Sequence, residues 1–254
     1  MKILLSPAKS IDTTLSIPTP TPTTAVFLDD ATKLASKLAK LKEKDLMLLM
    51  HVSESIAELN VQRYKNWIAP TQLTNECKPA ATVFSGEVYR GLNVASFSED
   101  DFLFANQQVR ILSGLYGILK PLDLLYPYRL EMGTKWQISP KIKNLYAYWD
   151  DKISNYLTQE LATDEAIINL ASTEYFKAIQ PKKIKNRIIT PHFKDFKNGE
   201  YKVVMMYAKN ARGKMAHYAV KDRIENPELL KEYNEDNYRF DSNLSTENDW
   251  VFTR

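Results

Sequence analysis

Three short apolar runs, each followed at once by polar residues, constrain the fold of this chain more than any other feature. They occupy residues 2–5, 109–112 and 166–170. Segments with helical spacing of apolar residues separate them, as at 29–42 and 148–161. Buried strands that alternate with helices favour an α/β or mixed α+β fold around a central sheet. Because no repeat, low-complexity segment or linker interrupts the sequence, we expect residues 1–254 to form one compact domain.

A hairpin is expected near the carboxyl-terminal third of the chain. Asn198 and Gly199 separate two β-rich runs, at 187–196 and 201–209. Asn-Gly is the strongest short-range hairpin signal, because a type I′ turn needs positive φ at both central residues. Helical spacing then predicts a helix over 211–224, which would place Arg212 at its start.

Polar side chains follow the three apolar runs where each predicted strand ends. If these strands are parallel neighbours, their carboxyl ends meet at one edge of the sheet, where ligand clefts of open α/β sheets form. The cleft would then be lined by Ser6, Lys9, Ser113, Tyr116, Asn169, Ser172 and Glu174. Ser172 also fits the position of a helix N-cap, which would be a purely structural role.

Charge is distributed unevenly, although the net charge is only +3. Between Lys177 and Lys214 there are eleven basic residues and two acidic ones, whereas residues 224–254 carry a net negative charge. A basic block of this size is what phosphate binding requires. A solvated lysine-rich surface would explain it equally well.

Several classes of function lack their usual signatures. There is no phosphate-binding lysine loop, dinucleotide fingerprint or nucleophile elbow, and we expect no cofactor. One cysteine and three widely spaced histidines predict no metal site. No window approaches the roughly 18 apolar residues of a membrane helix, and residues 1–10 lack a signal-peptide pattern, so a cytoplasmic location is expected.

The motifs, taken together and in this order, resemble the YaaA family. They are SPAK at 6–9, GEVY at 86–89, LSGLYGI at 112–118, YRLEMG at 128–133, NLAS at 169–172, EYFK at 174–177 and ARGKM at 211–215. The resemblance runs from the first predicted strand to the last few residues. It implies a bacterial cytosolic protein of the hydrogen peroxide stress response, which limits free iron and iron-dependent damage to DNA. It also implies a basic cleft, a helix-hairpin-helix element and binding to double-stranded DNA.

The best place for a helix-hairpin-helix element is residues 46–67. A short helix there is interrupted at 51–53, and a second helix follows, for which Ser55 and Glu58 offer a capping box. Arg63 and Lys65 lie on that second helix and could contact phosphates. Two residues depart from the family pattern: Glu87 replaces a usual Asp, and His217 replaces a common Arg.

The leading hypothesis is a DNA-binding protein with little sequence preference. Its phosphate contacts would come from Lys9, Arg63, Lys65, Arg129, Lys209, Arg212 and Lys214. An alternative is an enzyme acting on a nucleobase or nucleoside in the same cleft, as a glycosidase or lyase with Glu131 or Glu174 as general acid or base. Glu131 has a simpler explanation as an ion-pair partner of Arg129. An iron-handling protein is the weakest interpretation, because histidine and cysteine are scarce.

Overall fold

A mixed eight-stranded sheet forms the centre of the protein. The structure, a computed structural model, describes residues 1–14 and 16–254. Five parallel strands make up the middle of the sheet: β12 (Asp249–Thr253), β9 (Ile188–Lys197), β8 (Ile167–Asn169), β1 (Lys2–Leu5) and β5 (Val109–Ser113). Three antiparallel strands are added: β6 (Gly117–Leu119) beside β5, β10 (Glu200–Lys202) beside β9 and β11 (Arg239–Phe240) beside β12. The predicted α/β class with a central sheet is therefore confirmed.

The three apolar runs are parallel neighbours, so the condition under which their polar ends share one edge of the sheet is met. In the register of the sheet, Ile3 lies opposite Val109 on one side and Ile168 on the other. Parallel strands are covered on both faces, which is why these runs are continuously apolar rather than alternating. Ile3, Leu4 and Leu5 are accordingly buried.

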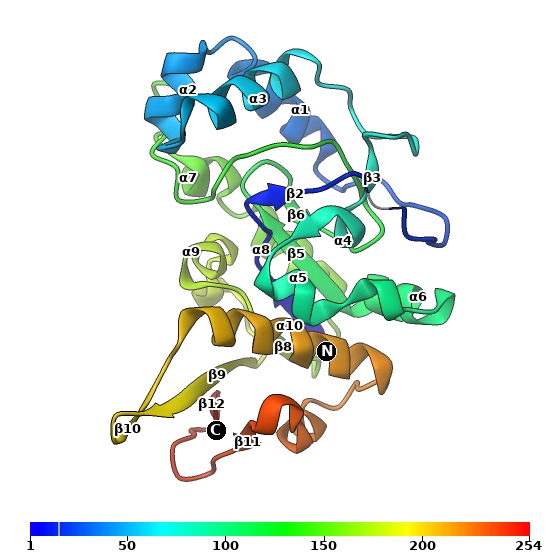
Figure 1. The fold of residues 1–254 in the computed structure, drawn as a ribbon, viewed down its shortest axis with the longest axis vertical. Coiled ribbons are helices and arrows are strands. Elements are labelled where there is room, and N and C mark those ends of the chain that lie inside the picture. The colour runs from blue at the N-terminus through cyan, green and yellow to red at the C-terminus, as the bar shows by residue number, and fades with distance from the viewer. Residues whose placement is uncertain (15) are drawn as a thin grey trace.

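Helices surround the sheet. They are α1 (Leu28–Leu38), α2 (Glu43–Met50), α3 (Glu54–Lys65), α4 (Ala80–Val83), α5 (Glu87–Leu92), α6 (Glu99–Gln108), α7 (Leu145–Trp149), α8 (Lys152–Glu160), α9 (Thr173–Phe176) and α10 (Met205–Lys221). Figure 1 shows α1, α2 and α3 grouped at one end of the molecule, whereas α10 crosses near the sheet and the β9–β10 hairpin projects at the other end. Within the described chain, no helix is long and apolar enough to cross a membrane.

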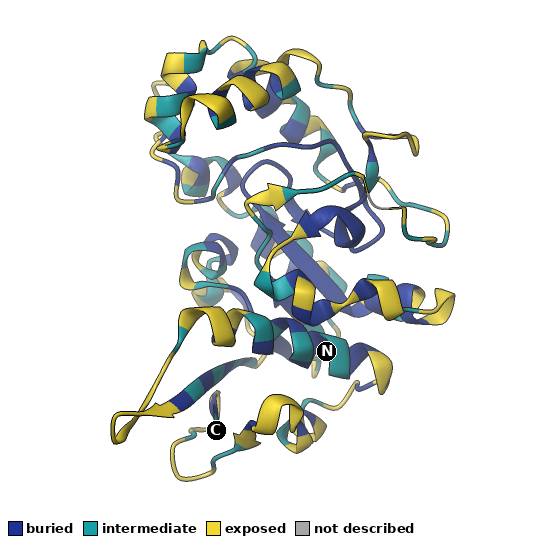
Figure 2. Ribbon diagram, viewed as in Figure 1, coloured by how far each residue is buried: buried dark blue, intermediate teal, exposed yellow. Residues whose placement is uncertain are grey.

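Short elements complete the fold. Two small sheets pair β2 (Ser10–Ile11) with β4 (Phe84–Ser85), and β3 (Lys78–Pro79) with β7 (Leu124–Leu125). Short 3₁₀ helices are η1 (Val94–Ser96), η2 (Lys177–Ile179), η3 (Pro181–Lys183), η4 (Pro227–Glu232) and η5 (Glu235–Asn237). Figure 2 shows the central strands buried and the hairpin tip exposed.

The hairpin prediction is confirmed at its turn and wrong in its second strand. Asn198 and Gly199 have φ values of 55° and 85°, as a type I′ turn requires. However, β10 ends at Lys202, and α10 begins at Met205 rather than at 211. The apolar residues that suggested a long strand instead form the exposed first turn of a helix.

Two helix predictions need correction. The segment 148–161 is not one helix, because Asp150 has a φ of 36° and separates α7 from α8. Ser55 and Glu58 do not form a capping box: α3 begins at Glu54, and Ser53 occupies the N-cap position without a capping side-chain hydrogen bond. The helix starts two residues earlier than the capping motif indicated.

Helices α5 and α10 cross at two glycines. A Cβ atom on Gly213 would lie 1.8 Å from the carbonyl oxygen of Val88, and one on Gly91 would lie 2.2 Å from that of Asn210. Glycine is needed at both positions because the two backbones touch, not because of an unusual φ. This contact sets how far α10 stands from α5.

We predict that Gly213→Ala destabilises the protein although alanine is the better helix former. The helix propensity gain of about 1 kcal/mol is outweighed by a backbone clash, so the free energy of unfolding should fall by about 2 kcal/mol. Urea denaturation measures this. Met206→Ala, at a side chain 55% exposed on the same helix, should change stability by less than about 0.5 kcal/mol. Equal stability of Gly213→Ala and the parent would show that the two helices are free to separate.

Candidate functional site

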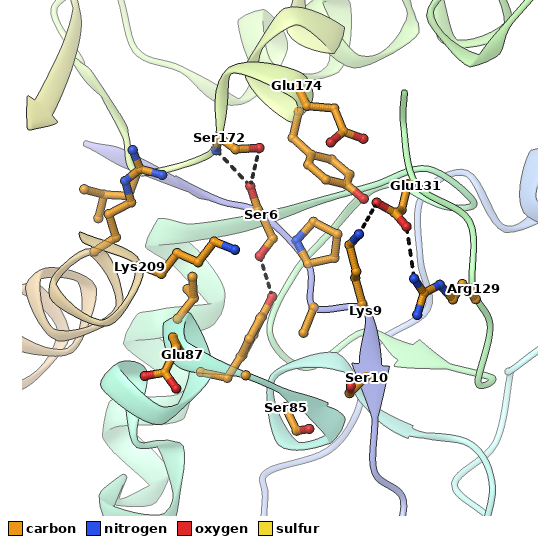
Figure 3. A pocket seen from close by; sticks show the side chains of 18 of the residues that line it. Ser6, Lys9, Ser10, Ser85, Glu87, Arg129, Glu131, Ser172, Glu174 and Lys209 are labelled. Atoms are coloured by element: carbon orange, nitrogen blue, oxygen red, sulfur yellow. Dashed lines mark hydrogen bonds and ion pairs between the residues drawn. The ribbon is translucent and has the colours of Figure 1, made fainter. Parts of the chain in front are cut away.

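A pocket of about 630 Å³ opens at the carboxyl ends of β1 and β8. Its walls come from the residues that follow these strands, from the start of α5, from the loop 128–131 and from α10. This is the edge where the parallel strands were expected to bring polar residues together. Figure 3 shows the pocket with Ser6 near its centre.

Ser6 joins three elements that form the floor of the pocket. Its hydroxyl accepts a hydrogen bond from the backbone N–H of Ser172 at 2.9 Å and donates one to the Ser172 hydroxyl at 3.3 Å. The Tyr89 hydroxyl donates to the Ser6 carbonyl at 3.0 Å. Ser172 occupies the N-cap position of α9, but its side chain caps no N–H there. The predicted N-cap position of Ser172 is therefore confirmed, but without a capping side-chain hydrogen bond.

An ion-pair chain lies on one side of the pocket. The Glu131 carboxylate contacts Lys9 Nζ at 2.8 Å through one oxygen and Arg129 at 3.2 Å through the other. Arg129 is largely buried, and its Nε has no hydrogen-bond partner. Lys9 and Glu131 come from segments far apart in sequence, so only the fold could reveal their contact.

Glu174 and three tyrosines form the neighbouring wall. Glu174 Oε1 accepts the backbone N–H of Gly133 at 2.8 Å. Tyr89, Tyr128 and Tyr175 are buried lining residues. Burial raises the pKa of each of these phenols well above its usual range, so their hydroxyls stay neutral.

Helix α10 supplies cations on the opposite side. Lys209 and Arg212 both line the pocket, and within the described residues neither side chain has an acidic partner. Arg212 Nε is buried and has no hydrogen-bond partner in residues 1–14 and 16–254, and burial lowers the pKa of its guanidinium. The sequence placed Arg212 at a helix start, which is wrong: it lies inside α10, so only its side chain can meet an anion.

Three predicted lining residues instead support the pocket from beneath. Ser113 is fully buried against the Tyr128 hydroxyl at 2.6 Å, and Tyr116 is fully buried. Asn169 accepts the N–H of Ala171 at 3.1 Å and donates to Thr190 at 3.3 Å. Their strands or turns point these side chains into the protein, so the prediction that they line the cleft is wrong.

Other predicted DNA contacts lie outside the pocket. Lys214 pairs with Asp236 at 2.6 Å, and Arg63 and Lys65 lie on α3. The basic block is spread over several elements, from η2 to α10. Part of it is neutralised by the acidic tail: Arg187, for example, pairs with Glu228 at 2.9 Å.

The sequence analysis missed one side of the pocket. Ser85, Gly86, Glu87 and Val88 line it where β4 leads into α5. The available signal was the GEVY motif, with a glycine that has a φ of 146°. No group of three or more histidine, cysteine, aspartate or glutamate side chains in residues 1–14 and 16–254 is arranged to hold a metal.

The fold and the pocket define an α/β protein with a polar cleft, which Lys209 and Arg212 line without acidic partners among the described residues. Comparison with known sequences identifies the family. The chain belongs to the family described as "Peroxide stress protein YaaA", whose sequence model matches residues 1–244.

Similar proteins span the whole chain. A UPF0246 protein of Teredinibacter turnerae is 45% identical over 256 residues, covering 100% of this chain and 99% of its own length. A UPF0246 protein of Burkholderia vietnamiensis is 45% identical over 258 residues, covering 100% and 98%. One from Ralstonia pickettii is 45% identical over 256 residues, covering 100% and 99%.

We predict that Ser6→Ala weakens the floor of the pocket. The Ser172 N–H would lose its acceptor, which should lower the free energy of unfolding by roughly 1 kcal/mol. Ser10→Ala is the matched control, because this exposed serine also lines the pocket and its change should stay within about 0.5 kcal/mol. Chemical denaturation of both variants measures the difference. If both substitutions change the free energy of unfolding equally, Ser6 does not stabilise the floor of the pocket.

Proposed function

We propose that this chain binds double-stranded DNA, largely independently of sequence, through phosphate contacts at the pocket. The observation that carries the proposal is the pair of cations on α10, Lys209 and Arg212, which face the pocket without carboxylate partners in the described part of the chain. An arginine that is partly withdrawn from water without an anion is unfavourable unless a ligand supplies one. Lys9 and Arg129 lie across the pocket and add further positive charge, although Glu131 offsets part of it.

The projecting hairpin extends this basic surface. Because β9 runs parallel to β8, its last residues continue past the sheet edge where the pocket opens. Lys194, Lys197 and Lys202 lie on β9 and β10 and could reach phosphates beyond the pocket. Lys202 is paired with Glu200 of the same strand at 2.6 Å, so Lys194 and Lys197 are the better candidates.

A second phosphate contact is proposed at the α2–α3 turn. His51 ends α2 in a left-handed conformation with a φ of 52°, so this turn is made without glycine. The Ser53 hydroxyl pairs with the Ser55 hydroxyl at 3.1 Å and makes no capping hydrogen bond, which leaves the first N–H groups of α3 available to a phosphate oxygen. Arg63 and Lys65 lie in the last turn of the same helix. This arrangement supports a helix-hairpin-helix-like role.

In the cell, this binding would serve the peroxide stress response. We propose that the chain acts in the cytoplasm, where it occupies DNA and limits iron-dependent oxidative damage to it. Membership of the family supports a role in the peroxide stress response. Lys209 and Arg212, which line the pocket, support the proposed contact with DNA.

An enzyme acting on a nucleobase is the second candidate, and one observation favours it: Glu131 and Glu174 both line the pocket. Both oxygens of Glu131 are already in contact with cations, however. A carboxylate held in this way positions Lys9 and Arg129 more readily than it transfers a proton to a ligand. The geometry therefore favours binding over catalysis.

We predict a steep dependence of DNA affinity on salt. Each phosphate contact releases counterions, so two to six contacts should give a log–log slope of about −2 to −5, with little effect of DNA sequence. Fluorescence anisotropy with a labelled duplex between low and moderate salt measures the slope. A dissociation constant that does not change with salt would contradict phosphate binding.

We predict that Lys209→Ala combined with Arg212→Ala weakens DNA binding and makes the salt slope shallower by about 2. The matched control removes two positive charges from the same basic block, with Lys182→Ala and Lys185→Ala, both exposed and outside the pocket lining. The control should keep the parent's slope, and circular dichroism should be unchanged in both. Equal losses in the two double variants would show that the pocket has no special role.

A further inference from the structure

The two sides of the pocket differ in chemistry. Lys209 and Arg212 offer positive charge on one side, whereas Glu131 and Glu174 place carboxylates on the other. Figure 3 shows Lys209 and Glu131 on opposite sides, with Ser6 between them. A pocket with this polarity suits a ligand that has an anion at one end and hydrogen-bond donors at the other.

The cationic side keeps its charge despite a nearby acid. Glu87 also lines the pocket, but it pairs with Arg90 at 2.7 Å. Lys209 and Arg212 have no such partner among the described residues. Their charge therefore remains available for an anion, such as a phosphate group, that enters the pocket.

The carboxylate side can accept hydrogen bonds. Glu174 uses Oε1 to accept the Gly133 N–H at 2.8 Å, whereas Oε2 has no partner in the described part of the chain. A carboxylate oxygen accepts hydrogen bonds from the exocyclic amino group of a nucleobase. The Tyr89, Tyr128 and Tyr175 side chains provide the apolar wall that a planar base needs.

We propose that the pocket binds a single nucleoside monophosphate unit. Lys209 and Arg212 hold its phosphate, and the base lies towards Glu174 and the tyrosines. The volume of about 630 Å³ falls within the usual range for small-molecule sites, roughly 300–1,000 Å³. Bases with an exocyclic amino group are preferred over thymine, because they can donate to Glu174.

The unit can come from two sources, a free nucleotide or one extruded from a DNA duplex. The inference goes beyond DNA binding and rests on that proposed function only for the second source. Extrusion costs a few kcal/mol of unstacking and unpairing, least at a mismatch or another damaged position. The two sources are distinguished by separate measurements on the same full-length protein.

The first experiment is isothermal titration calorimetry with the four deoxynucleoside 5′-monophosphates, the unphosphorylated nucleosides and inorganic phosphate. The monophosphates should bind at least tenfold more tightly than the nucleosides or phosphate. Arg212→Ala should weaken them by on the order of tenfold to a hundredfold, whereas the control Lys185→Ala should not. Glu174→Gln should reduce the preference for amino-bearing bases over thymidine monophosphate while phosphate binding is kept.

The second experiment uses a duplex with 2-aminopurine at a mismatch, whose fluorescence rises when the base leaves the stack. A rise on adding the protein, reversed by excess free monophosphate, would identify extruded DNA as a source. Binding of free monophosphates without that rise would identify the free nucleotide. If neither occurs while the duplex is still bound, the mononucleotide site is refuted and DNA binding stands. If monophosphates bind but DNA does not, the DNA-binding proposal fails and this inference stands.

Discussion

The parallel pairing of β1 with β5 and β8 is the constraint from which the functional site follows. Each of these strands is apolar because both faces of the sheet are covered, and each turns polar where it leaves the sheet. Parallel pairing puts those polar ends at the same edge. Ser6 then fixes their relative position, since its hydroxyl binds the Ser172 backbone and its carbonyl accepts from Tyr89.

The glycine crossing of α5 and α10 brings the cationic side to the same place. Because Gly91 and Gly213 lie at the contact, the backbones of α5 and α10 touch. Lys209 and Arg212 line the pocket together with the first residues of α5. A larger residue at either glycine would push α10 outward and move both cations away from Ser6. The packing of two helices and the electrostatics of the site thus depend on one backbone contact.

The charges around the pocket are of two kinds, and their difference decides what the site can do. Lys9 and Arg129 share the single carboxylate of Glu131, which offsets part of their charge, and Lys214 and Arg187 are paired with residues of the acidic tail. Among the described residues, Lys209 and Arg212 line the pocket without a carboxylate partner. Only such unpaired charges gain a partner on binding, so they outweigh the larger number of paired lysines in the basic block.

The sequence by itself determined the class of the fold, the hairpin turn and the family. These depend on short-range signals: apolar runs, helical spacing, the Asn198-Gly199 pair and the order of motifs. It also located the edge of the sheet at which Ser6, Lys9, Ser172 and Glu174 meet.

Only the tertiary structure decided which side chains enter the pocket. Ser113, Tyr116 and Asn169 follow the right strands but point into the protein, because side-chain direction is set by packing and hydrogen bonds with distant residues. Whether a cation is paired is decided in the same way, since the partners of Lys9 and Lys214 come from other segments.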